Sequence, residues 1–349
     1  MSDCRLKQPV IPELDELERV IALGGDALDV RVLATVHAGE GQSLPLYVVS
    51  LGNPSPDAAA VGYFGGVRGL ERIGSQVVIA FLHNVVTRLP WDVGLRRQLE
   101  SVRLVFMPIV NPGGMLRGTR ANPNGVDLMR NAPVQACEPV PFLIGGQRIS
   151  SGLPWYRGKR GDPMQAESHA LCELVERELL GRPFGLVLDC HSGFGMRDRL
   201  WFPYAHRRAP MPHVAHLHAL EQLFQRSHVR HPYVFEPQSR QYLAHGDLWD
   251  HLYLAACERH LGVFLPLTLE MGSWLWVKKN PRQLLTRHGI FNPLIAHREQ
   301  RVLRRHFALL EFMMAAAAGH PLWLPDARQL EQHRAAALAR WYSPGLSRT

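Results

Sequence analysis

The chain has 349 residues, of which 46% are hydrophobic and 20% are charged, a balance that excludes a disordered protein. Its formal net charge is +8, from 39 basic and 31 acidic residues. The arginines are spread along the whole chain with acidic residues nearby, whereas a nucleic-acid-binding protein usually gathers them in a stripe. No apolar run reaches the length of a membrane span. We therefore expect neither nucleic-acid nor membrane partners.

The cysteines and the N-terminus indicate the compartment. The five cysteines are Cys4, Cys137, Cys172, Cys190 and Cys257. They are odd in number, irregularly spaced and form no CxxC pair, which is typical of reduced thiols. The first twenty residues carry acidic side chains and lack the apolar segment of a secretory signal. These features predict a cytoplasmic protein.

The predicted elements alternate between helices and strands along the chain. A helix is predicted at 12–24, where a proline begins the segment and a glycine ends it. Apolar patterns predict strands at 30–36, 44–51, 59–63, 103–110, 184–189 and 263–269. Helical patterns follow Leu70 and recur at 165–180, 212–226, 244–258 and 297–318. This order predicts an α/β fold with a mixed, mainly parallel sheet flanked by helices.

Polar residues follow the predicted strands at the positions where α/β proteins form their sites. Binding sites in open α/β sheets lie beyond the carboxyl ends of the strands. The four relevant strand ends are followed by Arg68 and Glu71, by the glycine-rich loop 111–131, by His191, and by Glu270. The sequence therefore predicts that these groups meet at one edge of the sheet.

The motifs at these strand ends resemble those of the zinc carboxypeptidase family, and of its bacterial members in particular. The motifs are GVRGLE at 66–71, NPGG at 111–114, NGVDLMRN at 124–131, LDCHSG at 188–193 and TLEMG at 268–272. Their order and spacing match the family over about residues 55–315. The resemblance implies one carboxypeptidase-like domain over residues 1–321, followed by a helical C-terminal extension at 322–349.

The resemblance also implies the roles of a metal-assisted hydrolase. Glu71 and His191 would bind one zinc ion, which activates a water molecule. Glu270 would take the proton of that water, and Arg117 would stabilise the developing oxyanion. Asp189, two residues before His191, could orient the imidazole.

Two further positions concern the substrate. Arg130 would bind a substrate carboxylate through its planar guanidinium, and Tyr242 stands where the family has a mobile active-site tyrosine. Met129 stands where the family has an asparagine that helps to bind a terminal carboxylate. A thioether is a weak acceptor and donates no hydrogen bond. Strict carboxypeptidase specificity is therefore not implied, and cleavage of another amide stays open.

Arg68 is the main departure from the family, because it stands at the position of the first zinc-binding histidine. A guanidinium has no free lone pair for a metal, and Arg68 could instead pair with Glu71 and leave the site without metal. The nearest replacement ligands are His83 and Cys190. His83 lies about three helical turns beyond Glu71, and Cys190 should face away from His191 on a strand. A third option is that Arg68 moves aside and the two remaining ligands hold zinc weakly.

Two functions follow from these observations. The first is a zinc-dependent hydrolase that cleaves an amide bond of a small peptide or of an acylated amino acid. The alternative is a catalytically impaired relative that binds a peptide or carboxylate ligand without turnover. The sequence contains no signal for an oligomeric state.

Overall fold

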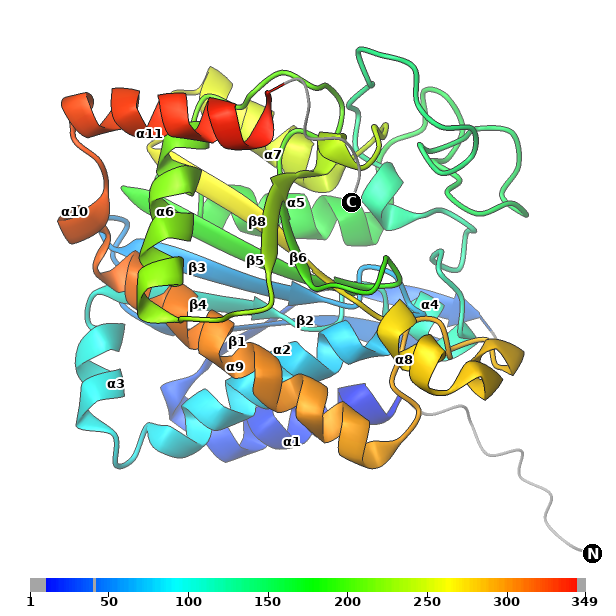
Figure 1. Cartoon of the computed structure of the whole chain (residues 1–349). Helices are drawn as coiled ribbons and strands as arrows, with labels where there is room; N and C mark the ends of the chain where they lie inside the picture. Colours follow the sequence, from blue (N-terminus) through cyan, green and yellow to red (C-terminus); the bar gives the residue numbers. More distant parts are fainter. Residues whose placement is uncertain (1–10, 40–41, 344–349) are drawn as a thin grey trace, which may run out of the picture.

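The computed structural model describes residues 11–39 and 42–343, and in these residues the strands form one eight-stranded sheet with helices on both faces (Figure 1). The strand order is β1-β2-β4-β3-β5-β8-β6-β7. The strands are β1 (Asp29–Gly39), β2 (Gln42–Gly52), β3 (Ala59–Gly65), β4 (Val102–Met107), β5 (Phe184–Ser192), β6 (Arg199–Phe202), β7 (Val234–Pro237) and β8 (Val263–Met271). The four central strands β4, β3, β5 and β8 are parallel to one another. The predicted α/β fold with a mixed, mainly parallel sheet is confirmed.

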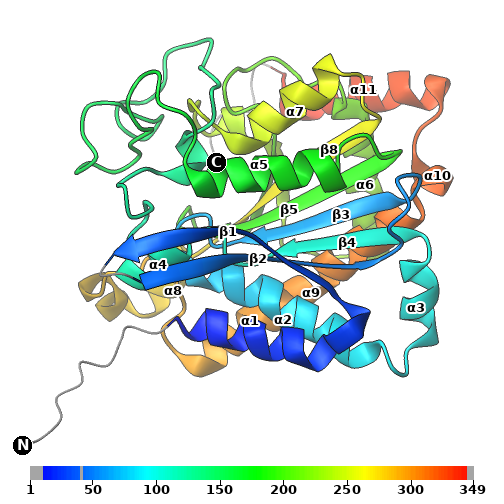
Figure 2. The ribbon, with the colours of Figure 1, turned by 180° about the vertical axis from the view of Figure 1, so that it is seen from behind.

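Helices cover the two faces of this sheet. The helices are α1 (Pro12–Gly24), α2 (Arg72–Arg88), α3 (Val93–Leu99), α4 (Pro112–Arg117), α5 (Ala166–Glu178), α6 (Val214–Ser227), α7 (Leu248–Glu258), α8 (Trp274–Lys279), α9 (Ala296–Ala318), α10 (His320–Trp323) and α11 (Ala327–Trp341). Short 3₁₀ turns lie at Gly25–Ala27, Leu128–Arg130, Gln238–Arg240 and Pro281–Leu285. Helices α1, α2 and α9 lie on one face of the sheet, and α5 and α7 lie on the other (Figures 1 and 2).

The central strands are buried because both of their faces are covered. Every residue of β3, β4 and β5 is buried, which is the environment expected for continuous apolar strands. The structure adds β6 and β7, which the sequence did not predict. Each has four residues, so neither is long enough to show a clear alternation.

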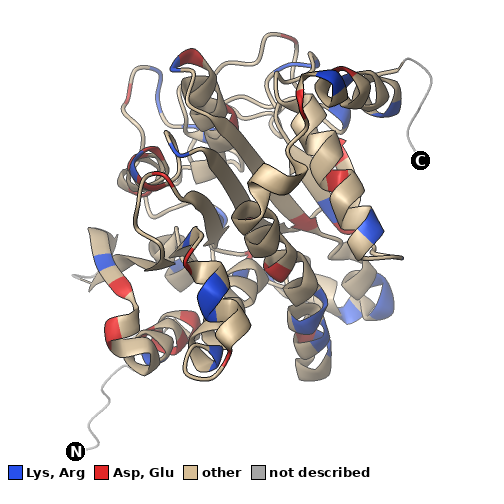
Figure 3. Cartoon of the chain, turned by 90° about the vertical axis from the view of Figure 1, so that its left-hand side faces the viewer, with Lys and Arg blue, Asp and Glu red and all other residues tan. Residues whose placement is uncertain are grey.

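The described part of the C-terminal segment contains the helices α10 and α11. Helix α11 packs against α6, and Trp341 donates a hydrogen bond from Nε1 to the carbonyl of Phe235 in β7 (2.9 Å). Residues 344–349 lie outside the described residues, as does Cys4. No helix in the ranges 11–39 and 42–343 combines the length and hydropathy that a membrane crossing needs. Basic and acidic residues are interspersed over the helices on the side seen in Figure 3.

Two features of the fold bring the strand ends into register. His191 at the end of β5 pairs with Glu270 at the end of β8. Helix α2 begins directly after Glu71 and packs closely against β5, since a Cβ atom added at Gly74 would lie 2.1 Å from the carbonyl oxygen of Cys190. The positions of Glu71 and His191 are thus fixed by contact between the backbones of two elements.

Candidate functional site

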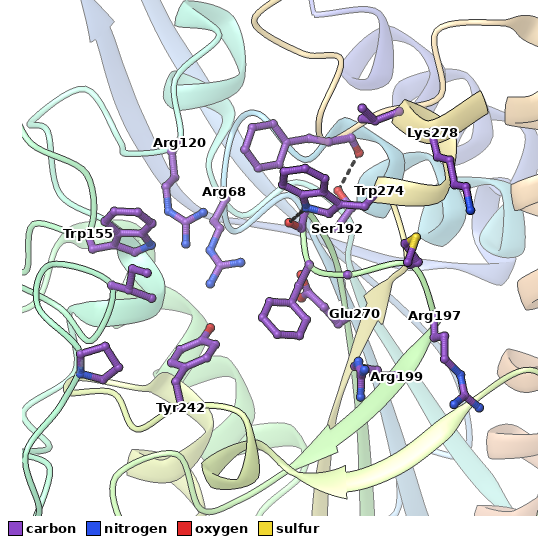
Figure 4. Close-up of a pocket in the computed structure, with 18 residues that line it drawn as sticks. Arg68, Arg120, Trp155, Ser192, Arg197, Arg199, Tyr242, Glu270, Trp274 and Lys278 are labelled. Atoms are coloured by element: carbon purple, nitrogen blue, oxygen red, sulfur yellow. Dashed lines mark hydrogen bonds between the residues drawn. The ribbon is translucent and has the colours of Figure 1, made fainter. Parts of the chain in front are cut away.

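A cavity of about 1050 Å³ opens at the carboxyl ends of β5 and β8 (Figure 4). Its walls come from the segments 141–155, 192–199 and 274–291. Arg68, Arg120, Tyr242 and Glu270 also line it. The expected convergence of polar groups at this edge of the sheet is therefore found in the structure.

Arg68 lies at the centre of the buried charges. Its Nη1 atom is 3.0 Å from Oε1 of Glu71 and 3.5 Å from Nδ1 of His191. Its Nε atom is 4.0 Å from Oδ1 of Asp127. Burial opposes a charge here, yet the carboxylates of Glu71 and Asp127 outweigh it and raise the pKa of Arg68. The guanidinium is thus a fixed cation between the two groups expected to bind zinc.

Both carboxylate oxygens of Glu71 already have partners. Oε1 accepts from Arg68, while Oε2 accepts from Nδ1 of His191 (2.8 Å) and from the backbone N–H of Ser192 (3.1 Å). Burial would raise the pKa of this carboxyl, but Arg68 and His191 lower it to about 2. Glu71 is therefore ionised and fully engaged by groups of the protein.

His191 lies between two carboxylates. Its Nδ1 atom faces Glu71, and its Nε2 atom is 2.6 Å from Oδ2 of Asp189. Because each ring nitrogen meets a carboxylate oxygen, both nitrogens donate and the ring is an imidazolium. Burial alone would lower the pKa of His191, but Asp189 and Glu71 raise it to about 10. Asp189 also accepts a hydrogen bond from Nε1 of Trp249 (2.8 Å), a partner that the sequence did not reveal.

These residues do not fit a zinc ion. A metal needs lone pairs, and those of His191 Nδ1 and of Glu71 are taken up by protons and by Arg68. Within the part of the chain that the structure describes, no group of three or more His, Cys, Asp or Glu side chains is arranged to hold a metal. The two replacement ligands considered from the sequence do not help, because His83 is exposed on α2 and Cys190 is buried in the core.

The structure places Arg117 away from the cavity. Its guanidinium donates to the carbonyl oxygens of Ala38 and Pro123, both at 2.9 Å. Arg120, three residues further on, lines the cavity instead. The oxyanion role was expected for Arg117 from the sequence, and the order of residues along the chain does not show which of the two arginines points inward.

Arg120 is held by the same network. Its Nε atom donates to Oδ2 of Asp127 (2.7 Å), and its Nη1 atom is 3.8 Å from Oε1 of Glu71. Its guanidinium carbon lies 5.5 Å from the ring centre of Trp155, within the range of a cation–π contact. Burial would raise the pKa of Asp127, but Arg120 and Arg68 lower it to about 2. Arg120 is thus oriented toward the cavity by a carboxylate and by an aromatic face.

Arg130 and Tyr242 are in contact. The Nη2 atom of Arg130 donates to the hydroxyl of Tyr242 (3.3 Å), and Nη1 donates to the carbonyl of Met129 (3.2 Å). Arg130 is only 1% exposed and lines a second cavity of about 10 Å³, not the large one. Tyr242 lines both cavities. In this arrangement Tyr242 separates Arg130 from the large cavity.

Glu270 has a raised pKa, whereas the pKa values of Glu71 and Asp127 are lowered. It is 3% exposed and lines the large cavity. Burial and the charge of Glu71 raise its pKa to about 7, against the opposing effect of Arg68. Near neutral pH this group therefore exists in both protonation states.

Comparison with known proteins identifies the family. A sequence profile of the zinc carboxypeptidase family matches residues 32–265, which is more than half of the chain. The chain belongs to the zinc carboxypeptidase family. Carboxypeptidase SOL1 of Arabidopsis thaliana is 30% identical over 94 residues, which are 26% of this chain and 19% of that protein. The chain thus matches only about a fifth of the length of that relative.

Solved structures of metallocarboxypeptidases have the same fold. Thrombin-activatable fibrinolysis inhibitor superposes with a TM-score of 0.63 at 17% identity, over 86% of this chain and 72% of that one. Carboxypeptidase A from Helicoverpa armigera gives a TM-score of 0.60 at 16% identity, over 87% and 71% of the two chains. At such identities the likeness shows the fold alone. Membership of the zinc carboxypeptidase family and this fold together support a metallocarboxypeptidase-like hydrolase in general terms.

Proposed function

We propose that this chain is a metallocarboxypeptidase-like protein that binds a small peptide or an acylated amino acid through its carboxylate, without zinc. One observation carries the proposal. The Nη1 atom of Arg68 contacts both Glu71 and His191, the two side chains that a zinc ion would need. A guanidinium supplies positive charge to these groups but cannot act as a Lewis acid toward a water molecule.

The charges of the site balance without a metal. The cations are Arg68, Arg120 and His191, and the anions beside them are Glu71, Asp127 and Asp189. A divalent ion added to this set would face three cations, of which Arg68 and His191 are buried, and this repulsion disfavours it. The surplus group is Glu270, whose raised pKa leaves it partly neutral near pH 7.

The cavity offers a carboxylate ligand a suitable partner. Arg68 and Arg120 both line it, and Figure 4 shows their guanidinium groups pointing into the open space from one side. Charge-assisted hydrogen bonds between guanidinium and carboxylate are among the stronger polar contacts in proteins. These two arginines would bind and orient the ligand. Glu270, which also lines the cavity, would add a negative charge there when it is ionised.

Metal analysis of purified protein tests this proposal. After incubation with zinc and dialysis, the wild-type chain should retain much less than one zinc per chain, and Arg68→His should retain about one. Arg72→His is the matched control, because Arg72 pairs with Glu13 outside the cavity; it should bind no additional zinc. Stoichiometric zinc in the wild-type chain that disappears in Glu71→Gln would contradict the proposal. Carboxylate binding, the second part of the proposal, is tested by titrating acetylglycine into the protein in the presence of a chelator. Binding under these conditions would not depend on zinc.

Zinc-dependent hydrolysis is the second candidate. It is favoured by Glu270, a buried carboxyl that lines the cavity and whose pKa of about 7 suits a general base. It requires Arg68 to leave its present contacts. Amide hydrolysis by the wild-type chain that depends on added zinc and is lost in Glu270→Gln would establish this function in place of the first.

A further inference from the structure

The side chains that line the large cavity are unbalanced in charge. The cations are Arg68, Arg120, Arg197, Arg199 and Lys278, against the single carboxyl of Glu270; the carboxylates that pair with Arg68, Arg120 and Arg199 lie behind this lining. Charges of one sign around a cavity with low-dielectric walls raise the local concentration of ligands of the opposite sign. The ligand is therefore expected to be an anion.

The walls of the cavity are apolar and extend to the surface. Ile144 and Trp155 belong to one segment, and Met196, Trp274 and Phe291 belong to two others. Ile144, Met196 and Trp274 are 41%, 56% and 45% exposed, and exposed apolar side chains gathered around one opening are typical of a ligand-binding groove. In Figure 4 Trp155 and Trp274 lie on opposite sides of the open space. The cavity thus has Arg68 and Arg120 on one side, Arg197, Arg199 and Lys278 on the other (Figure 4), and an apolar channel that leads outward.

The polar groups on these walls are already paired within the protein. The hydroxyl of Ser192 donates to the carbonyl of Phe291 (2.7 Å), and Nε1 of Trp274 donates to the carbonyl of Gly193 (3.1 Å), as the dashed lines in Figure 4 show. Arg199 is engaged by Glu236. A peptide backbone in this channel would bury N–H and C=O groups that find few partners, which is costly. A hydrocarbon chain carries no such groups.

We propose that the ligand is an amino acid carrying a medium- or long-chain N-acyl group. Its carboxylate binds at Arg120 and Arg68, and its acyl chain lies between the apolar walls formed by Trp155 and Trp274. A volume of about 1050 Å³ is at the upper end of the roughly 300–1,000 Å³ typical of ligand pockets, and exceeds what a single short amino acid needs. This inference rests on the proposed carboxylate-binding function and specifies its ligand.

The test is a chain-length series. Acetylglycine, hexanoylglycine and decanoylglycine are titrated into the full chain with a chelator present, and heat or tryptophan fluorescence is recorded. Affinity should rise about fourfold for each added methylene, because burial of one methylene group contributes about 0.8 kcal/mol of binding free energy. The methyl ester of decanoylglycine should bind at least about tenfold more weakly than the acid, because it lacks the charge that pairs with arginine.

A matched pair of tryptophan variants tests where the acyl chain of the ligand lies. Trp274→Ser should flatten the dependence on chain length, since it removes one wall of the channel. Trp91→Ser changes a tryptophan that is 68% exposed and donates to the carbonyl of Thr87 outside the cavity; it should keep the wild-type dependence. Equal flattening in both variants would assign the effect to something other than the channel.

The outcomes separate this inference from the proposed function. If acetylglycine and decanoylglycine bind with equal affinity, the inference of a long acyl chain is wrong, but the proposed carboxylate-binding function is supported. If a tripeptide of matched apolar surface binds more tightly than decanoylglycine, the channel accepts peptides and the inference is overturned. If none of these carboxylates binds, the proposed function fails together with it.

Discussion

Two histidine sites in this chain differ in charge. At the end of β5, His191 lies between Asp189 and Glu71, and these carboxylates raise its pKa to about 10. Between α6 and α11, Nδ1 of His218 lies 2.8 Å from Nδ1 of His333. Burial, with repulsion from His333 and Arg340, lowers the pKa of His218 to about 4. One ring is an imidazolium at neutral pH and the other is neutral.

The difference shows that the neighbours of a histidine, and not its place in a motif, decide what it can bind. In the neutral pair one ring nitrogen donates and the other keeps a lone pair. At His191 both nitrogens carry protons that point to carboxylates, and Arg68 supplies further positive charge. A motif histidine in such surroundings takes part in an ion network and does not act as a metal ligand.

Breaking the charged site should have the largest effect. Arg68→Met removes the more buried of the two arginines that Glu71 and Asp127 share, and loss of one partner from a buried ion pair costs about 3–5 kcal/mol of unfolding free energy. Arg208→Met is the matched control, because Arg208 and Glu138 form an ion pair in which the side chain of Arg208 is 62% exposed; there the loss should stay below about 1 kcal/mol. Urea unfolding measures both. Similar losses in the two variants would mean that the buried network adds no stability.

Acid should affect the neutral pair more than the charged one. The pKa of His218 is lower in the folded than in the unfolded chain, so its contribution to stability is present above pH 6.5 and is lost as the pH falls toward about 4. His191 has a raised pKa and stays protonated through this range. We expect His218→Gln to reduce the loss of unfolding free energy between pH 7 and pH 5 by about 1–2 kcal/mol. Urea unfolding at the two pH values gives this difference, and an unchanged loss would contradict the assignment.

The smallest effect concerns Glu270. Its pKa of about 7 means that it gains negative charge as the pH rises through neutrality, next to the arginines proposed to bind a carboxylate. Ligand affinity should therefore fall about threefold between pH 6 and pH 8, which corresponds to a weak charge repulsion at high effective dielectric. Glu270→Gln should remove this dependence in calorimetric titrations. A wild-type affinity that does not change with pH would place the ligand away from Glu270.

The fold and the meeting of the main site residues were predictable from the sequence. Long apolar runs separated by helical patterns indicated the central strands, and parallel strands place their carboxyl ends at one edge. This geometry brings Glu71, His191 and Glu270 together, and the pair of Arg68 with Glu71 is one of the alternatives that the sequence left open. These conclusions needed only local patterns and one general rule of topology.

The remaining contacts depend on packing that the sequence does not encode locally. Arg117 and Arg120 lie three residues apart in a glycine-rich segment, and only the path of that loop decides which one faces the cavity. Trp249 reaches Asp189 across 60 positions of the chain. Such long-range partners carry no periodic signal, so the protonation of His191 became evident only from the structure.

The close approach of Gly74 to Cys190 has a consequence for how this site responds to substitution. Because the first turn of α2 touches the end of β5 backbone to backbone, the spacing between Glu71 and His191 is set by the scaffold and not by the cation between them. The scaffold therefore survives the exchange of that cation. A replacement at position 68 should therefore change the charge between these two side chains and leave the spacing of the backbone that carries them unchanged.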